Sequence, residues 1–156
     1  MKTCVIVVDA WEKCLFEDTN KFPFWQQECN AFATFLQIQL CQIKNKFSYH
    51  IYHLSWDPIT QYIDLFDGNI YDKQWQLNLN KLGYENIFFC GFHLFSCVKN
   101  SYKSFLKITK NKQNNAAIVY NLSLIKPGGT FVNTKYKYVY YTHKLGFSRI
   151  KVELHE

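Results

Sequence analysis

One segment of the sequence, residues 87–98, combines the residue types that nucleophilic catalysis needs. Its letters, IFFCGFHLFSCV, predict a buried strand ending at Gly91, a tight turn, and a helix whose first turn contains Cys97. A helix N-terminus carries partial positive charge and N–H groups without intrahelical partners. A thiol placed there is favoured as the thiolate, and the N–H groups near Phe95 to Cys97 could form an oxyanion hole. The segment therefore predicts Cys97 as a nucleophile.

A carboxylate follows the first predicted strand. Residues 3–8, TCVIVV, are typical of a strand buried on both faces, and Asp9 stands at its carboxyl end. Functional groups gather beyond the carboxyl ends of parallel strands, so Asp9 could accept the proton of the Cys97 thiol. Two structural interpretations stay open. Asp9 could instead cap a turn or a helix, and a lone cysteine is often only a small apolar core residue.

Strands and helices are predicted to alternate along the chain. Beyond 3–8, the pattern predicts strands at 47–54, 86–90, 116–120 and 147–154 and helices at 24–44, 72–82 and 95–108, while 134–145 fits either a helix or a strand. This alternation predicts an α/β protein, a three-layer α/β/α sandwich with a mostly parallel central sheet. The length favours a single domain over residues 1–156.

The element order and the spacing Gly91-x-x-x-x-x-Cys97-Val98 are similar to the isochorismatase-like superfamily, which includes nicotinamidases and N-carbamoyl amide hydrolases. The resemblance implies a Rossmann-like sheet and a Cys–Asp–Lys triad, with Cys97 as nucleophile and Asp9 as base. It also implies a non-proline cis peptide between Phe92 and His93. The expected activity is hydrolysis of a small amide, or of a related C–N or ether bond, without a cofactor.

The sequence departs from that family at the triad lysine and before the cysteine. Leu94 and Phe95 occupy the positions of the family's Thr-Asp pair, and residues 51–72 contain no lysine. Lys73 and Lys81 come too late in the order to replace it. The alternative prediction is therefore a catalytically impaired relative, a pseudoenzyme that serves as a binding or scaffold protein.

Several residues are predicted to line a substrate site beside Asp9 and Cys97. They are His93, Leu94, Phe95 and Ser96 in the turn, and the aromatic residues Trp11, Phe16 and Trp56 near other strand ends. The aromatic side chains could stack on a flat substrate, but an ordinary place in the core is an equal alternative. We expect His93 to line the pocket rather than to act as a base.

No metal site is predicted. His50 and His53 fall on opposite or misplaced faces of one strand, and Asp57 has no histidine beside it. The six cysteines form no C-x-x-C pair, which argues against structural zinc.

The resemblance implies a small molecule as the partner, and composition adds that the protein is globular. Hydrophobic residues make up 48% and charged residues 19%, as in a globular protein, and no apolar run is long enough for a membrane span. Lys99, Lys103, Lys107 and Lys110 form a basic stripe, which we interpret as a solvated face rather than a nucleic-acid footprint. Scattered cysteines without a signal peptide favour the cytoplasm, and the resemblance allows a homo-oligomer.

Overall fold

The computed structural model describes residues 2–10, 25–56, 63–92, 94–110, 115–124, 136–142 and 148–154. Strands and helices alternate over the larger part of the chain. In order they are β1 (Thr3–Val8), α1 (Trp25–Phe47), β2 (His50–Leu54), a 3₁₀ turn (Ile63–Leu65), β3 (Gly68–Asn69), α2 (Trp75–Lys81), β4 (Asn86–Phe92), a π turn (Leu94–Val98), α3 (Lys99–Thr109), β5 (Asn115–Leu124), β6 (Tyr136–Thr142) and β7 (Ser148–Leu154). Among the helices within these ranges, none has the length and hydropathy that a membrane crossing requires.

Within the described residues, seven strands form one sheet in the order β3-β2-β1-β4-β5-β7-β6. Strands β1 to β5 run parallel to one another, and β7 pairs antiparallel with both β5 and β6. The predicted α/β class with a mostly parallel sheet is therefore confirmed. The complete three-layer sandwich stays a prediction. The segment 134–145, which fitted two alternatives, contains strand β6.

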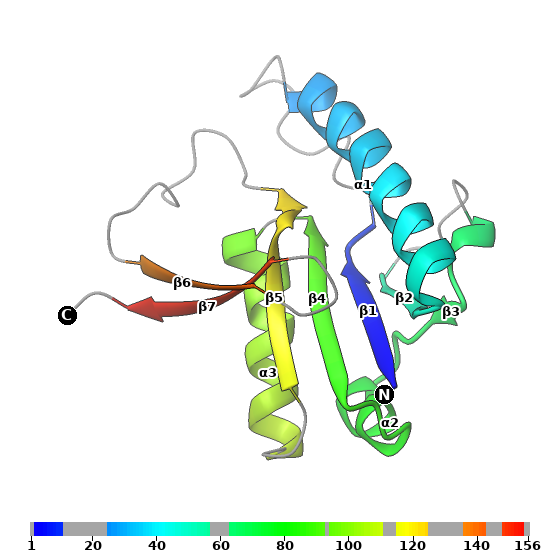
Figure 1. The fold of residues 1–156 in the computed structure, drawn as a ribbon. Coiled ribbons are helices and arrows are strands. Elements are labelled where there is room, and N and C mark those ends of the chain that lie inside the picture. Colours follow the sequence, from blue (N-terminus) through cyan, green and yellow to red (C-terminus); the bar gives the residue numbers. More distant parts are fainter. Residues whose placement is uncertain are drawn as a thin grey trace.

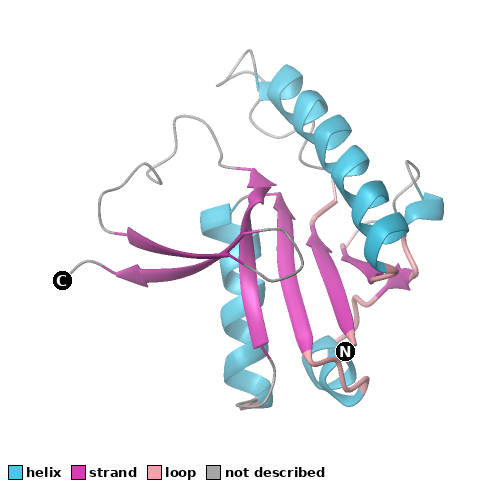
Figure 2. Cartoon of the chain, viewed as in Figure 1, coloured by secondary structure: helices cyan, strands magenta, loops and turns pink. Residues whose placement is uncertain are grey.

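The side chains of β1 alternate between two hydrophobic clusters on opposite faces of the strand. Val5 and Val7 lie in one cluster with Leu40 of α1. Ile6 lies in the other cluster with Phe105 of α3. Helices α1 and α3 accordingly lie on opposite sides of β1 and β4 (Figure 1), and the central strands lie between helices (Figure 2). Because both of its faces are covered, β1 is apolar from Cys4 to Val8.

Some apolar side chains of α1, and the one that follows α2, are exposed. Phe35 of α1 is 44% exposed, since Leu36 and Leu40 are the residues that face the sheet. Leu82 is 42% exposed because α2 ends before it, at Lys81. Gly83 follows the end of α2: it has φ 72° and donates its N–H to the Asn80 carbonyl at 3.2 Å.

The direction in which successive strands are added to the sheet reverses between β1 and β4. From β1 the chain continues to β2 and β3 on one side, and from β4 it continues to β5 on the other side. In open α/β sheets, ligands bind outside the carboxyl ends of strands at this point of reversal. Asp9 follows β1 and Cys97 follows β4, so both come from the two strands that flank it.

Candidate functional site

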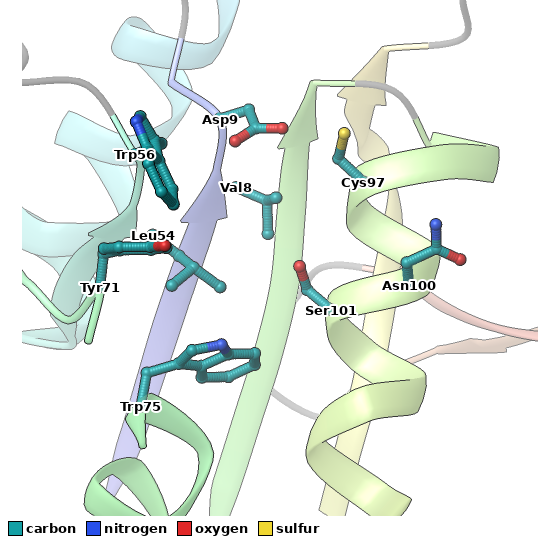
Figure 3. Close-up of a pocket in the computed structure, with 9 residues that line it drawn as sticks. All are labelled: Val8, Asp9, Leu54, Trp56, Tyr71, Trp75, Cys97, Asn100 and Ser101. Atoms are coloured by element: carbon teal, nitrogen blue, oxygen red, sulfur yellow. The ribbon is translucent and has the colours of Figure 1, made fainter. Parts of the chain in front are cut away.

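A pocket of about 320 Å³ lies at this edge of the sheet (Figure 3). Its lining residues are Val8, Asp9, Leu54, Trp56, Tyr71, Trp75, Cys97, Asn100 and Ser101. The volume is at the lower end of the range for small-molecule sites. Of the predicted site residues, the pocket brings together Asp9, Cys97 and Trp56.

The backbone at Asp9 is held in an uncommon conformation. Its φ is 49°, in the left-handed region that aspartate tolerates better than most non-glycine residues. The Asp9 N–H donates to the Leu54 carbonyl at 3.0 Å, and the next N–H, of Ala10, donates to Ser55 Oγ at 3.2 Å. These two bonds fix the backbone on the end of β2. The Asp9 carboxylate is directed across the end of β4, toward the side on which Cys97 lies (Figure 3).

Gly91 allows β4 to approach β1 closely beside Asp9. It pairs with Val8 and has φ 119°, a backbone conformation that residues with a side chain rarely adopt. A Cβ at this position would lie 2.5 Å from the Val8 carbonyl oxygen and 2.8 Å from the Val8 nitrogen. The pairing of β4 with β5 also changes register between Phe89 and Gly91. The close approach of the two strands therefore requires glycine at Gly91, the first position of the Gly91-Cys97-Val98 motif.

Cys97 lies in a π turn, Leu94–Val98, that runs directly into α3. Such wide turns occur often at functional sites. Val98 is fully buried in the cluster that includes Phe105, and it anchors the turn. The Cys97 side chain is half-buried, lines the pocket, and has its Sγ 3.9 Å from Ser96 Oγ. Ser96, a predicted binding residue, contacts Cys97 but is not part of the described pocket lining.

Aromatic side chains form the opposite side of the pocket. The rings of Trp56 and Tyr71 meet edge to face at 5.1 Å, and Trp56 is 72% exposed. Asn69 fixes this corner, because its Nδ2 donates to the Ser55 carbonyl at 3.1 Å and its Oδ1 accepts the Tyr71 N–H at 3.0 Å. Trp75 is nearly buried, so it serves the core as well as the pocket.

Two of the other described thiols are poorly suited to nucleophilic attack. Cys4 and Cys90 are completely buried, and burial raises the pKa of each thiol well above its usual range. Cys41 is half-buried on α1, where Gln37 Nε2 lies 3.4 Å from its Sγ. Cys97 is therefore the thiol, among the described cysteines, that lines the pocket.

The described lining of the pocket carries one carboxylate and no cationic side chain. Asp9 is its acid, and no lysine, arginine or histidine is among the nine residues. Lys73 and Lys81 are exposed at either end of α2, outside that lining. The triad lysine that the resemblance implies therefore has no counterpart among these nine side chains.

The two histidines of β2 face opposite sides of the sheet. His50 Nδ1 lies 2.6 Å from the Tyr84 hydroxyl, whereas the His53 ring packs on Phe66 at 4.9 Å. Burial lowers the pKa of His53 to about 4. In the ranges that the structure describes, no three His, Cys, Asp or Glu side chains gather as a metal site would require. The expected absence of a metal stays a prediction.

Some predicted site residues lie outside the described residues or side chains. These are Trp11, Phe16, His93, Leu94 and Phe95. The implied cis peptide between Phe92 and His93 falls outside them as well.

The pocket also contains residues that the sequence analysis missed. Asn100 and Ser101 follow Cys97 by three and four positions, so helical spacing could have placed them on the same face. Tyr71 comes from a segment without a periodic pattern, and no sequence signal connects it to the site.

The fold and site define an α/β protein with a thiol and a carboxylate in one pocket at the point of strand reversal. Neither a family model, a curated protein nor a solved structure matches the chain.

Proposed function

We propose that the chain is a divergent isochorismatase-like cysteine hydrolase that acts on a small amide or a related C–N or ether bond. The observation that carries this proposal is the shared pocket of Asp9 and Cys97, two residues that follow different strands and are far apart in sequence. A thiol beside a carboxylate, at the start of a helix, is an arrangement suited to acyl transfer.

For an amide, the reaction would run in two steps. Cys97 Sγ attacks the carbonyl carbon while Asp9 accepts the thiol proton, and backbone N–H groups at the start of the helix stabilise the oxyanion. The C–N bond then breaks, and the amine leaves with the proton from Asp9. In the second step water attacks the thioester, which releases the carboxylic acid and restores the thiol.

The proposed setting is a reducing cytoplasm, with a small molecule as the partner. All four described cysteines are free, as expected for such a compartment. The pocket volume supports a small ligand rather than a nucleic acid.

Alkylation by iodoacetamide tests the nucleophile, and Cys41 serves as the reference thiol in the same molecule. We expect Cys97 to react about tenfold faster than Cys41 near neutral pH, measured by mass spectrometry of each site. The variant Asp9→Asn should abolish this advantage. Asparagine tolerates the left-handed backbone of Asp9, so the variant removes the charge without straining the fold. Equal alkylation rates of Cys97 and Cys41 in the wild-type protein would refute the proposed role of Cys97.

A second candidate function is ligand binding without catalysis. The absence of a cationic side chain from the described pocket lining favours it, because nothing there replaces the triad lysine. Reaction with 4-nitrophenyl acetate separates the two candidates. A hydrolase should show an acyl adduct on Cys97 that decays as acetate is released. A binding protein should show no turnover, and its Cys97→Ala variant should bind ligands as the wild type does.

A further inference from the structure

The pocket has an aromatic side and an acidic side. Trp56, Tyr71 and Trp75 come from the end of β2 and the segment through α2, and they face the space from one side (Figure 3). Asp9 and Cys97 lie at the carboxyl ends of the neighbouring strands, across that space. The described lining thus combines ring faces, a carboxylate and an ionisable thiol, without a positive charge.

We propose that this pocket selects a small organic cation, a ligand with a primary or quaternary ammonium group. The inference rests on the proposed function, because it takes the pocket of Asp9 and Cys97 as the substrate site. Aromatic faces attract cations through their quadrupole, and Trp is the strongest of the aromatic residues in this respect. A carboxylate in the same pocket adds Coulomb attraction, and this negative charge stays in the pocket when the proton of Cys97 passes to Asp9.

The charge of the whole chain predicts the opposite preference. The net charge is +6, which favours anions through the long-range field. Selection of a cation must therefore arise locally, from the side chains within the pocket.

Binding by the Cys97→Ala protein tests this proposal apart from any chemistry. The probes are choline, its neutral carbon analogue 3,3-dimethylbutan-1-ol, and the anion 3,3-dimethylbutanoate, compared by isothermal titration calorimetry. We expect choline to bind about tenfold more tightly than the neutral alcohol, and the anion to bind least. The preference should decrease as salt is added, because ions screen the attraction at a partly exposed site.

Three further variants in the same background locate the selectivity. Trp56→Ala and Asp9→Asn should each reduce the preference for choline, and both positions tolerate the change because Trp56 is exposed and Asn suits the Asp9 backbone. Phe35→Ala changes another exposed aromatic residue, on α1 and outside the described pocket lining, and should leave the preference unchanged.

Choline binding no tighter than that of the neutral alcohol, including no binding of either, would overturn the cation proposal. A preference that survives in both Trp56→Ala and Asp9→Asn would overturn it too. Neither result bears on the alkylation rate of Cys97 in the wild-type protein, so a failure of this inference is distinguishable from a failure of the hydrolase proposal.

Discussion

Replacing Gly91 by alanine tests how the end of β4 positions the pocket. The added Cβ would lie 2.5 Å from the Val8 carbonyl oxygen and 2.8 Å from the Val8 nitrogen. Both are backbone atoms of a central strand that is paired on each side, so no rotation of a side chain can relieve the overlap. The strand end must move instead, and Asp9 follows directly after Val8.

Two costs add in the Gly91→Ala variant. A non-glycine residue in a sparsely populated backbone conformation, here φ 119°, costs about 1–3 kcal/mol. Forcing extra volume into a packed site costs roughly a further 1–3 kcal/mol. We therefore expect the free energy of unfolding to fall by about 4 kcal/mol, a large part of the roughly 5–15 kcal/mol typical of a domain.

Gly83→Ala provides the matched control. Gly83 also has a positive φ, 72°, but a Cβ there would meet no atom within 4 Å. This variant should lose only the conformational term, about 1–2 kcal/mol. Urea unfolding followed by tryptophan fluorescence measures both variants. In the fraction of the Gly91→Ala protein that still folds, Cys97 should no longer be alkylated faster than Cys41. If the two substitutions lowered the free energy of unfolding equally, the close approach of β4 to β1 at Gly91 would be refuted.

The remaining predictions concern acid stability, thiol reactivity and one hydrogen bond at the start of β2. Burial lowers the pKa of His53 from 6.5 to about 4, so the unfolded protein binds more protons than the folded protein between these pH values. The free energy of unfolding should therefore fall by about 3 kcal/mol when the pH is lowered from above 6.5 to 4. The His53→Phe variant should lose less free energy of unfolding over the same change, measured by urea titrations at both pH values. Cys4 and Cys90, whose thiol pKa values burial raises, should resist Ellman's reagent at pH 8 until the protein is unfolded. Asp67→Ala removes the carboxylate that accepts the Ile51 N–H at 2.7 Å and should cost about 2 kcal/mol in urea, whereas Asp67→Asn, which keeps an acceptor, should cost less.

The central strands could be predicted from sequence because their burial leaves a continuous apolar signal. Strand β1 contains no charged residue, and β4 extends only two residues beyond its predicted end, through Gly91 to Phe92. Strand β3 could not be predicted, since it consists of Gly68 and Asn69 alone and forms through pairing with β2. The sequence pattern of the β6 segment was compatible with both a helix and a strand, because its tyrosines and valine suit either one face of a helix or a strand.

The candidate site was predictable where it depends on strand ends and not where it depends on tertiary hydrogen bonds. Asp9 and Cys97 follow recognisable strands, so their approach follows from the parallel topology. The contact of Tyr71 with Trp56 depends on Asn69, whose side chain joins the end of β2 to the residues after β3. No local pattern encodes that connection, which is why the aromatic side of the pocket was missed in part.

The two candidate functions differ in what compensates a negative charge on Cys97. When Asp9 has accepted the thiol proton, the thiolate holds one negative charge that nearby positive charge or hydrogen-bond donors would stabilise. None of the described lining residues is cationic, and among them the contribution comes from the start of the helix at the π turn. A cationic ligand would supply the rest, and catalysis would then depend on the charge of the substrate. A hydrolase of this kind should cleave amides that carry an ammonium group faster than their neutral analogues, whereas a binding protein should hold the same cations without cleaving them.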